Sequence, residues 1–278
     1  MVINDLIRES KIDRLETILI LCKLLDVDKS YIYTYGEKEV EDHIGPKFLE
    51  LMEKRHSGYP IQYILEEREF MGLDFYLEEG VLVPRPDTEI LVEYIIEYIK
   101  KNYKEDKINV LDIGIGSGAI SLSIASYLKN TQVFGIDISD TAIKVANINK
   151  EKFKLSNVNF YKGDLFKALE DFNMEGEFDI IVSNPPYIKS EEIQSLDIQV
   201  KDHEPRLALD GGLDGLDFYR RITKDSLEYL KDNSLLIYEI GYEQSKEVED
   251  ILKLSAFKDV STLKDLQGHD RVVLGIKR

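Results

Sequence analysis

The sequence predicts an α/β protein in which a doubly wound sheet of seven strands follows a small helical domain and a β-hairpin linker. Three observations predict this fold class. Strand-like and helix-like segments alternate from Lys107 onward. Acidic or amide residues stand directly after several of the strand-like segments. The region before about residue 64 carries only the apolar spacing of helices. We therefore expect domain boundaries that give residues 1–64, 65–86 and 87–278.

Residues 1–64 have the spacing of amphipathic helices. One apolar stripe at helical spacing consists of Ile12, Leu15, Ile18, Leu19, Cys22 and Leu25. Pro46 fits the first turn of a later helix, and Gly58 fits its end. We expect these stripes to form the core of a small bundle that includes the single cysteine, Cys22. The bundle can also serve as a lobe that recognises a substrate.

Residues 65–86 are expected to connect the bundle to the sheet. The alternating segment 69–77 predicts two short strands around Gly72, Leu73 and Asp74. The linker is therefore expected to be a β-hairpin.

The next stretch is punctuated by prolines. Pro84 and Pro86 hold Arg85 in a rigid conformation, and Asp87 or Thr88 can cap the helix that follows. The residues leave two interpretations open. The stretch is either a linker with a helix cap or part of the wall of a ligand pocket.

The rest of the chain alternates between strands and helices and ends in a hairpin. Strands are expected to begin near Asn109, Gln132, Asn157, Asp179 and Leu235, with two more at 257–261 and 270–276. Helices are expected at 119–128, 142–153, 214–230 and 243–254. The connection between Tyr187 and Asp214 is long, and such loops are usually functional. Because it follows the strand that leads to Asn184, we expect it to cover the target site.

Segment 110–120 is an apolar strand, a glycine-rich turn and the start of a helix. Such a turn lets the backbone approach a ligand, and the helix N-terminus is electropositive. Gly114, Gly116 and Ala119 fit the dinucleotide fingerprint, so the motif alone suits either a nicotinamide enzyme or a methyltransferase. Asp112 favours the methyltransferase. A carboxylate there repels a pyrophosphate but suits the ammonium group of a methionine moiety.

Acids also end the next two strands. Asp137 can accept hydrogen bonds from both hydroxyls of a ribose. Asp164 can accept one from an adenine amine. Because ligands bind at the carboxyl ends of the strands in open α/β sheets, these acids are candidate cofactor ligands.

The fourth strand ends in Asn184-Pro185-Pro186-Tyr187. The amide oxygen of Asn184 and the carbonyl of Pro185 can accept both hydrogens of a planar NH2 group. Holding them turns the nitrogen lone pair towards an electrophile. Tyr187 offers a face against which an amide or a base can stack. The alternative is a Pro-Pro turn that only ends a strand.

Composition narrows the class of protein. The formal net charge is −17 and no long Lys/Arg run is present, which argues against a nucleic-acid partner. No apolar run approaches the roughly 18–20 residues of a membrane span, and the N-terminus has no signal-peptide pattern. The 4 histidines and 1 cysteine show no metal-site spacing. We expect a cytoplasmic monomer without a metal or a membrane partner.

Several motifs occur together across the chain. They are Arg55-x-x-Gly58-x-Pro60-x-Gln62-Tyr63-Ile64, the run 84–89, the loop 114–118, the run 184–187, the run 204–216 and Gly268-x-Asp270-Arg271. As a set they closely resemble the release-factor glutamine methyltransferases, also called the HemK family. Asn-Pro-Pro-Tyr alone is shared with adenine-N6 DNA methyltransferases. The resemblance covers almost the whole chain, including the helical lobe, and implies the class I methyltransferase fold.

The resemblance also implies a substrate and a cofactor. Family members methylate the side-chain amide of the glutamine in the Gly-Gly-Gln loop of peptide chain release factors, which gives S-adenosylhomocysteine as the second product. S-adenosylmethionine would lie against Gly114, Ile115, Gly116, Ser117, Gly118, Asp137 and Asn184. Asp164 and Leu165 would line the adenine. Some family members carry tryptophan where this chain has Leu165, so this wall of the site is smaller here.

Three other functions remain open from the sequence. The enzyme could methylate glutamine in another translation protein, such as a ribosomal protein. It could be an adenine-N6 DNA methyltransferase, although its acidic charge and the lack of a target-recognition domain argue against this. It could also be a non-catalytic adenosine-binding or scaffold protein, which would not need Asn184 and acids at three successive strand ends.

Overall fold

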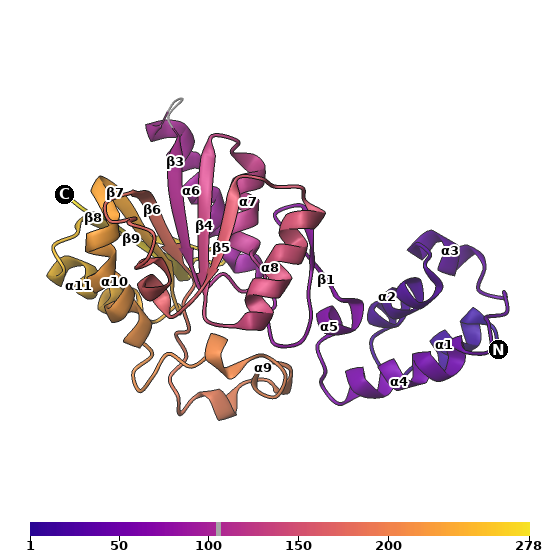
Figure 1. Ribbon diagram of the computed structural model, residues 1–278. Helices are drawn as coiled ribbons and strands as arrows, with labels where there is room; N and C mark the ends of the chain where they lie inside the picture. The colour runs from indigo at the N-terminus through magenta and orange to yellow at the C-terminus, as the bar shows by residue number, and fades with distance from the viewer. Residues whose placement is uncertain (104–106) are drawn as a thin grey trace.

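The computed structural model describes residues 1–103 and 107–278. Figure 1 shows a helical domain at the N-terminus beside a larger α/β domain. The helical domain consists of α1 (Ile3–Glu9), α2 (Arg14–Leu25), α3 (Lys29–Thr34), α4 (Ile44–His56) and α5 (Ile61–Leu65). Buried apolar side chains from these helices form one core. Arg55 of α4 also donates two hydrogen bonds to Glu16 of α2, at 2.6 and 2.8 Å, so an ion pair reinforces this packing.

The predicted apolar stripe on α2 is only partly correct. Leu15 is 52% exposed, whereas Ile20 and Leu21, which lie outside the stripe, are fully buried. The reason is that α2 packs against α3, α4 and α5, so neighbours cover more than one side of the helix. Cys22 is partly buried and packs against the core.

The predicted hairpin linker is confirmed, but its turn lies earlier than predicted. Strands β1 (Glu67–Phe70) and β2 (Leu73–Tyr76) pair antiparallel, with Phe70 opposite Leu73. Met71 and Gly72 alone form the turn, with φ of 51° and 68°. Two-residue turns with both residues left-handed match the twist of the flanking strands, so Leu73 and Asp74 belong to β2.

The predicted helix cap is wrong. A 3₁₀ turn, η1 (Pro86–Thr88), runs straight into α6 (Glu89–Asn102). Thr88 has the N-cap position, but its backbone is already helical and its side chain makes no capping hydrogen bond. Asp87 instead pairs with Arg271, at 3.2 Å. Both side chains are thus engaged with other parts of the domain.

The predicted sheet of seven strands is confirmed, with the order β5-β4-β3-β6-β7-β9-β8. The strands are β3 (Ile108–Ile113), β4 (Thr131–Asp137), β5 (Val158–Lys162), β6 (Phe178–Ser183), β7 (Leu230–Glu239), β8 (Lys258–Lys264) and β9 (Asp270–Ile276). The first five in this order pair in parallel, whereas β9 is antiparallel to both neighbours. From β3 the chain adds β4 and β5 on one side of the sheet and then β6 and β7 on the other. Such sheets bind ligands at this switch in strand order.

Helices cover both faces of the sheet (Figure 1). On one face the core joins α6 and α7 (Ala119–Tyr127) to alternate strand residues such as Val110 and Ile180. On the other it joins α10 (Asp217–Tyr229) and α11 (Ser245–Leu254) to the residues between them, such as Leu111 and Ile181. This alternation follows from the two-residue period of a strand.

The remaining elements are short or lie at the sheet edge. They are α8 (Asp140–Lys152), η2 (Leu165–Leu169), η3 (Ile193–Ser195), α9 (Ile198–Lys201) and η4 (Arg206–Ala208). Helix α8 contacts β4 and β5 as well as β2 of the hairpin, which fixes the linker to the large domain. Nowhere in 1–103 or 107–278 is a helix long and apolar enough to cross a membrane.

Candidate active site

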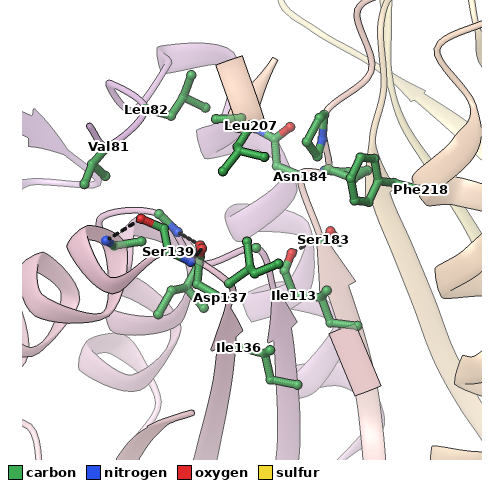
Figure 2. A pocket seen from close by; sticks show the side chains of 18 of the residues that line it. Val81, Leu82, Ile113, Ile136, Asp137, Ser139, Ser183, Asn184, Leu207 and Phe218 are labelled. Carbon is green, nitrogen blue, oxygen red and sulfur yellow. Dashed lines mark hydrogen bonds between the residues drawn. The ribbon is translucent and has the colours of Figure 1, made fainter. Parts of the chain in front are cut away.

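A cavity of about 420 Å³ lies where β3, β4 and β6 end, a size typical of a small-ligand site (Figure 2). Segments from seven parts of the chain line it, and most of the groups that the sequence predicted are among them. The lining includes Gly114, Ile115, Gly116, Ser117, Asp137, Asp164, Leu165, Asn184, Pro185 and Pro186. The structure thus brings together most of the predicted site residues. Asp112, Gly118 and Tyr187 are predicted site residues that do not line the cavity.

The glycine-rich turn brings its backbone to the edge of the cavity. Gly114 has φ of +79°, which favours glycine, and no atom lies within 4 Å of where its Cβ would be. The N–H groups of Gly114 and Ile115 donate to the carbonyl of Ile136, so the turn is tied to β4. Gly118 acts differently. Its φ is +82° and a Cβ there would be 2.9 Å from Leu122, so it permits close packing at the start of α7.

Asp137 has both carboxylate oxygens oriented by backbone groups. Oδ2 accepts from the N–H of Gly116 at 3.0 Å. Oδ1 accepts from the N–H of Ser139 at 2.9 Å (Figure 2). Burial raises the pKa of Asp137, although these hydrogen bonds oppose the rise. The carboxylate is therefore fixed at the cavity wall and couples the glycine-rich turn to the end of β4.

Asp112 lies behind the glycine-rich turn and is fully buried. One oxygen accepts from both the N–H and the hydroxyl of Ser121, at 3.1 and 2.5 Å, which ties α7 to β3. Its other oxygen has no hydrogen-bond partner among the described residues. Burial raises the pKa of Asp112 to about 7. Its predicted contact with an ammonium group stays a prediction.

Asp164 faces the cavity but is already engaged. Both of its oxygens accept from Nη2 of Arg221, at 2.7 and 2.8 Å. Arg221 and Phe218 come from α10 and also line the cavity. Leu165 follows with a left-handed φ of 53° and is nearly buried. The predicted contact of Asp164 with an adenine amine stays a prediction, and it would compete with Arg221 for the carboxylate.

The tip of β6 presents Asn184 and Pro185 to the cavity. The hydroxyl of Ser183 donates to the carbonyl of Ile113 at 2.6 Å, which fixes β6 against β3 just before the tip. Tyr187 packs against the core beneath, and its carbonyl accepts from Gln244 at 3.0 Å. Burial raises the pKa of Tyr187 to about 12. Its predicted stacking role stays a prediction.

Known proteins resemble this chain over most of its length. Family models match residues 104–239 as a methyltransferase domain and residues 4–65 as a PrmC N-terminal domain. A release factor glutamine methyltransferase of Clostridium acetobutylicum is 47% identical over 93% of this chain and 90% of its own length. The chain belongs to the release factor glutamine methyltransferases. A second relative of that name, from Fusobacterium nucleatum, is 44% identical over 95% of this chain and 73% of its own.

Solved structures support the fold of this methyltransferase. A Thermus thermophilus 16S rRNA N2 G1207 methyltransferase, solved with AdoMet and guanosine, has a TM-score of 0.54 with the chain. The two are 21% identical, and the match covers 76% of this chain and 50% of the other. The class I methyltransferase fold predicted from the sequence is confirmed.

The long loop after β6 lines one side of the methyltransferase cavity, and its predicted cover of the target site stays a prediction. Pro205, Leu207 and Ala208 line the cavity, and Figure 2 shows Leu207 on the same side as Asn184. The loop folds back on itself, because Gly211 N–H donates to the carbonyl of Ile188 at 2.8 Å.

An ion pair fastens this loop to the proline-rich stretch. Nη2 of Arg85 donates to both oxygens of Glu204, at 2.7 and 2.6 Å. The Glu204 side chain is 2% exposed and that of Arg85 40%. Arg85, Pro84 and Thr88 also line the cavity, which supports the interpretation of this stretch as pocket wall.

Sequence reasoning missed Thr88 and Glu239, which lie next to Asn184. Thr88 Oγ1 is 3.5 Å from Nδ2 of Asn184, and both residues lower the pKa of the buried carboxylate of Glu239, which lies beside them. Glu239 ends β7, as Asp137 ends β4, so the rule that identified Asp137 would also have found Glu239.

Proposed function

We propose that this protein transfers the methyl group of S-adenosylmethionine to the side-chain amide nitrogen of the glutamine in the Gly-Gly-Gln loop of peptide chain release factors. The observation that carries the proposal is the position of Asn184 and Pro185. Both line the same cavity as Asp137 and the glycine-rich turn. The names of the relatives support the choice of substrate.

The residues around the cavity fit S-adenosylmethionine. Asp137 offers a fixed carboxylate for the ribose hydroxyls, and Gly114 offers open backbone. The apolar side chains of Ile115 and Leu165 suit the flat adenine. When bound, the cofactor supplies a methyl group that its sulfonium already activates. The protein then needs to supply mainly alignment.

Asn184 and Pro185 would provide that alignment. Their two oxygens would accept both N–H groups of the substrate amide and turn its lone pair towards the methyl group. Productive transfer needs the nitrogen about 3–3.5 Å from the methyl carbon and in line with the sulfur. The same oxygens would stabilise the positive charge that develops on the nitrogen. The proton can leave to water afterwards.

We further propose that residues 1–64 recognise the release factor and that residues 87–278 carry the chemistry. Release factors act with the ribosome, so we place the enzyme in the cytoplasm. We also propose that the enzyme acts as a monomer.

Methyl transfer from labelled S-adenosylmethionine tests the proposal. The substrates are a purified release factor, a ribosomal protein fraction and DNA. Label on the release factor alone is the expected result. Label mainly on a ribosomal protein would favour the second glutamine methyltransferase function, and label on DNA would favour an adenine methyltransferase. Cofactor binding without transfer to any of them would favour a non-catalytic protein.

A further inference from the structure

The side-chain amide of Asn184 has an oxygen end and a nitrogen end. This inference rests on the proposed function, which requires the oxygen end to face the cavity. The oxygen and nitrogen ends of an amide have nearly the same shape. Packing alone therefore does not distinguish the productive orientation from the reversed one. A hydrogen-bonding group behind the amide has to select it.

Thr88 and Glu239 supply such groups. The register of β6 and β7 pairs Ser183 with Tyr238, so Asn184 and Glu239 follow side by side at the tips of two parallel strands. Thr88 approaches from the start of α6, with Oγ1 3.5 Å from Nδ2 of Asn184. The three side chains therefore lie close together, with Asn184 and Thr88 at the cavity wall and Glu239 behind it.

The chemistry of this contact selects one orientation. Glu239 is 2% exposed, and an ionised carboxylate can only accept hydrogen bonds. Asn184 and Thr88 both lower the pKa of Glu239 and so favour its ionised form, which places their donor groups close to the carboxylate. The nitrogen end of Asn184 therefore faces inward and its oxygen faces the cavity. In the reversed orientation two acceptors would meet in a buried place, where an unmade hydrogen bond is costly.

We propose that Glu239, together with Thr88, is a positioning residue that keeps the amide oxygen of Asn184 turned towards the substrate. Glu239 does not line the cavity, so it acts through Asn184. This role gives a reason for placing a carboxylate in the core of the domain.

No charged side chain among the described residues forms an ion pair with Glu239. Arg271 approaches from β9, but its Nη2 pairs with Asp87 and Asp265, at 3.2 and 3.1 Å. Oε2 of Glu239 has no hydrogen-bond partner among the described residues. The positive charge of Arg271 thus favours the ionised form of Glu239, although the two side chains form no ion pair.

The remaining neighbours are two phenols. Tyr219 donates from its hydroxyl to the backbone carbonyl of Glu239 at 3.0 Å, and Tyr187 lies nearby. Burial raises the pKa of both tyrosines, so they stay neutral near pH 7. Burial also raises the pKa of Glu239 to about 7, against the hydrogen bonds from Thr88 and Asn184. Once protonated, Glu239 can donate to Asn184 and no longer excludes the reversed amide.

Turnover of the release factor provides the first test. We expect Glu239→Gln to lower kcat by about tenfold, as for the loss of one charge-assisted hydrogen bond, with the S-adenosylmethionine Kd unchanged. The wild type should lose kcat as the pH falls below about 7, and the variant should lack this acid limb. Thr88→Val should lower kcat as well, and Thr88→Ser should restore it. Asp265→Asn, which removes another buried carboxylate beside Arg271, is the matched control and should keep both kcat and the acid limb.

A spectroscopic readout separates this inference from the proposed function. The side-chain NH2 resonance of Asn184, assigned with Asn184→Ala, should shift with pH near 7 in the wild type and stay constant in Glu239→Gln. If the resonance titrates but no release factor is methylated, the proposed function fails and the positioning contact stands. If the release factor is methylated while Glu239→Gln keeps full kcat and the acid limb, the positioning role is overturned.

Discussion

Replacing Asp137 by asparagine should weaken the binding of S-adenosylmethionine without unfolding the domain. The carboxylate holds two backbone N–H groups, those of Gly116 and Ser139, and still faces the cavity. An asparagine has one oxygen for these two donors. Its NH2 group must therefore face one of the N–H groups or turn towards the ribose, where it can no longer accept.

The size of the effect follows from the bonds that change. A hydrogen bond to a charged group contributes about 1.5–3 kcal/mol. Since about 1.4 kcal/mol corresponds to a tenfold change in affinity, the Kd should rise by roughly 10-fold to 100-fold. The displaced Gly116 would add to this loss, because the glycine-rich turn loses its tie to the end of β4.

Calorimetric titration with S-adenosylmethionine measures the change. Asp140→Asn is the matched control. It removes the same charge at a position three residues after Asp137, where the carboxylate forms only an exposed ion pair with Lys162. Such pairs contribute about 0–1 kcal/mol, so the control should bind normally. If Asp137→Asn binds as tightly as the control, the assignment of Asp137 to the ribose is refuted.

Three further predictions concern the tip of β6, the long loop and the helical lobe. Asn184→Ala should lower turnover by about 100-fold or more with a modest loss of cofactor affinity. Asn184→Asp should lower turnover as much, because its carboxylate would face that of Glu239. Near-normal kcat in both variants would show that the tip only ends a strand. Arg85→Ala leaves buried Glu204 unpaired, so the free energy of unfolding should fall by about 2 kcal/mol and loop 188–216 should become sensitive to limited proteolysis. An unchanged digestion pattern would contradict this. Deleting residues 1–64 should spare cofactor binding and abolish methylation of the intact release factor; full activity would make the lobe structural only.

Local patterns were sufficient to predict much of the site. The glycine-rich turn and Asp137 lie at strand ends that the apolar runs define, and parallel strands bring such ends to one edge. The same reasoning placed Asn184 beside them. The long loop was assigned to the target site from its length and position, and Leu207 of this loop lines the cavity.

Long-range contacts could not be predicted in the same way. Thr88 fits a helix cap in sequence, yet its hydroxyl lies by Asn184, which is 96 residues away. The partners of Arg85 and Asp164 are Glu204 and Arg221, and no local rule selects one opposite charge among many in so acidic a chain. Tertiary packing, rather than propensity, decides these pairs.

The position of the transferred methyl group tests the central claim most directly. A release factor incubated with the enzyme and labelled S-adenosylmethionine would be digested and analysed by fragmentation mass spectrometry. The account predicts the label on the side-chain amide nitrogen of the Gly-Gly-Gln glutamine, and no label when that glutamine is replaced by alanine. Label on another residue, or undiminished label on the alanine-substituted release factor, would contradict it.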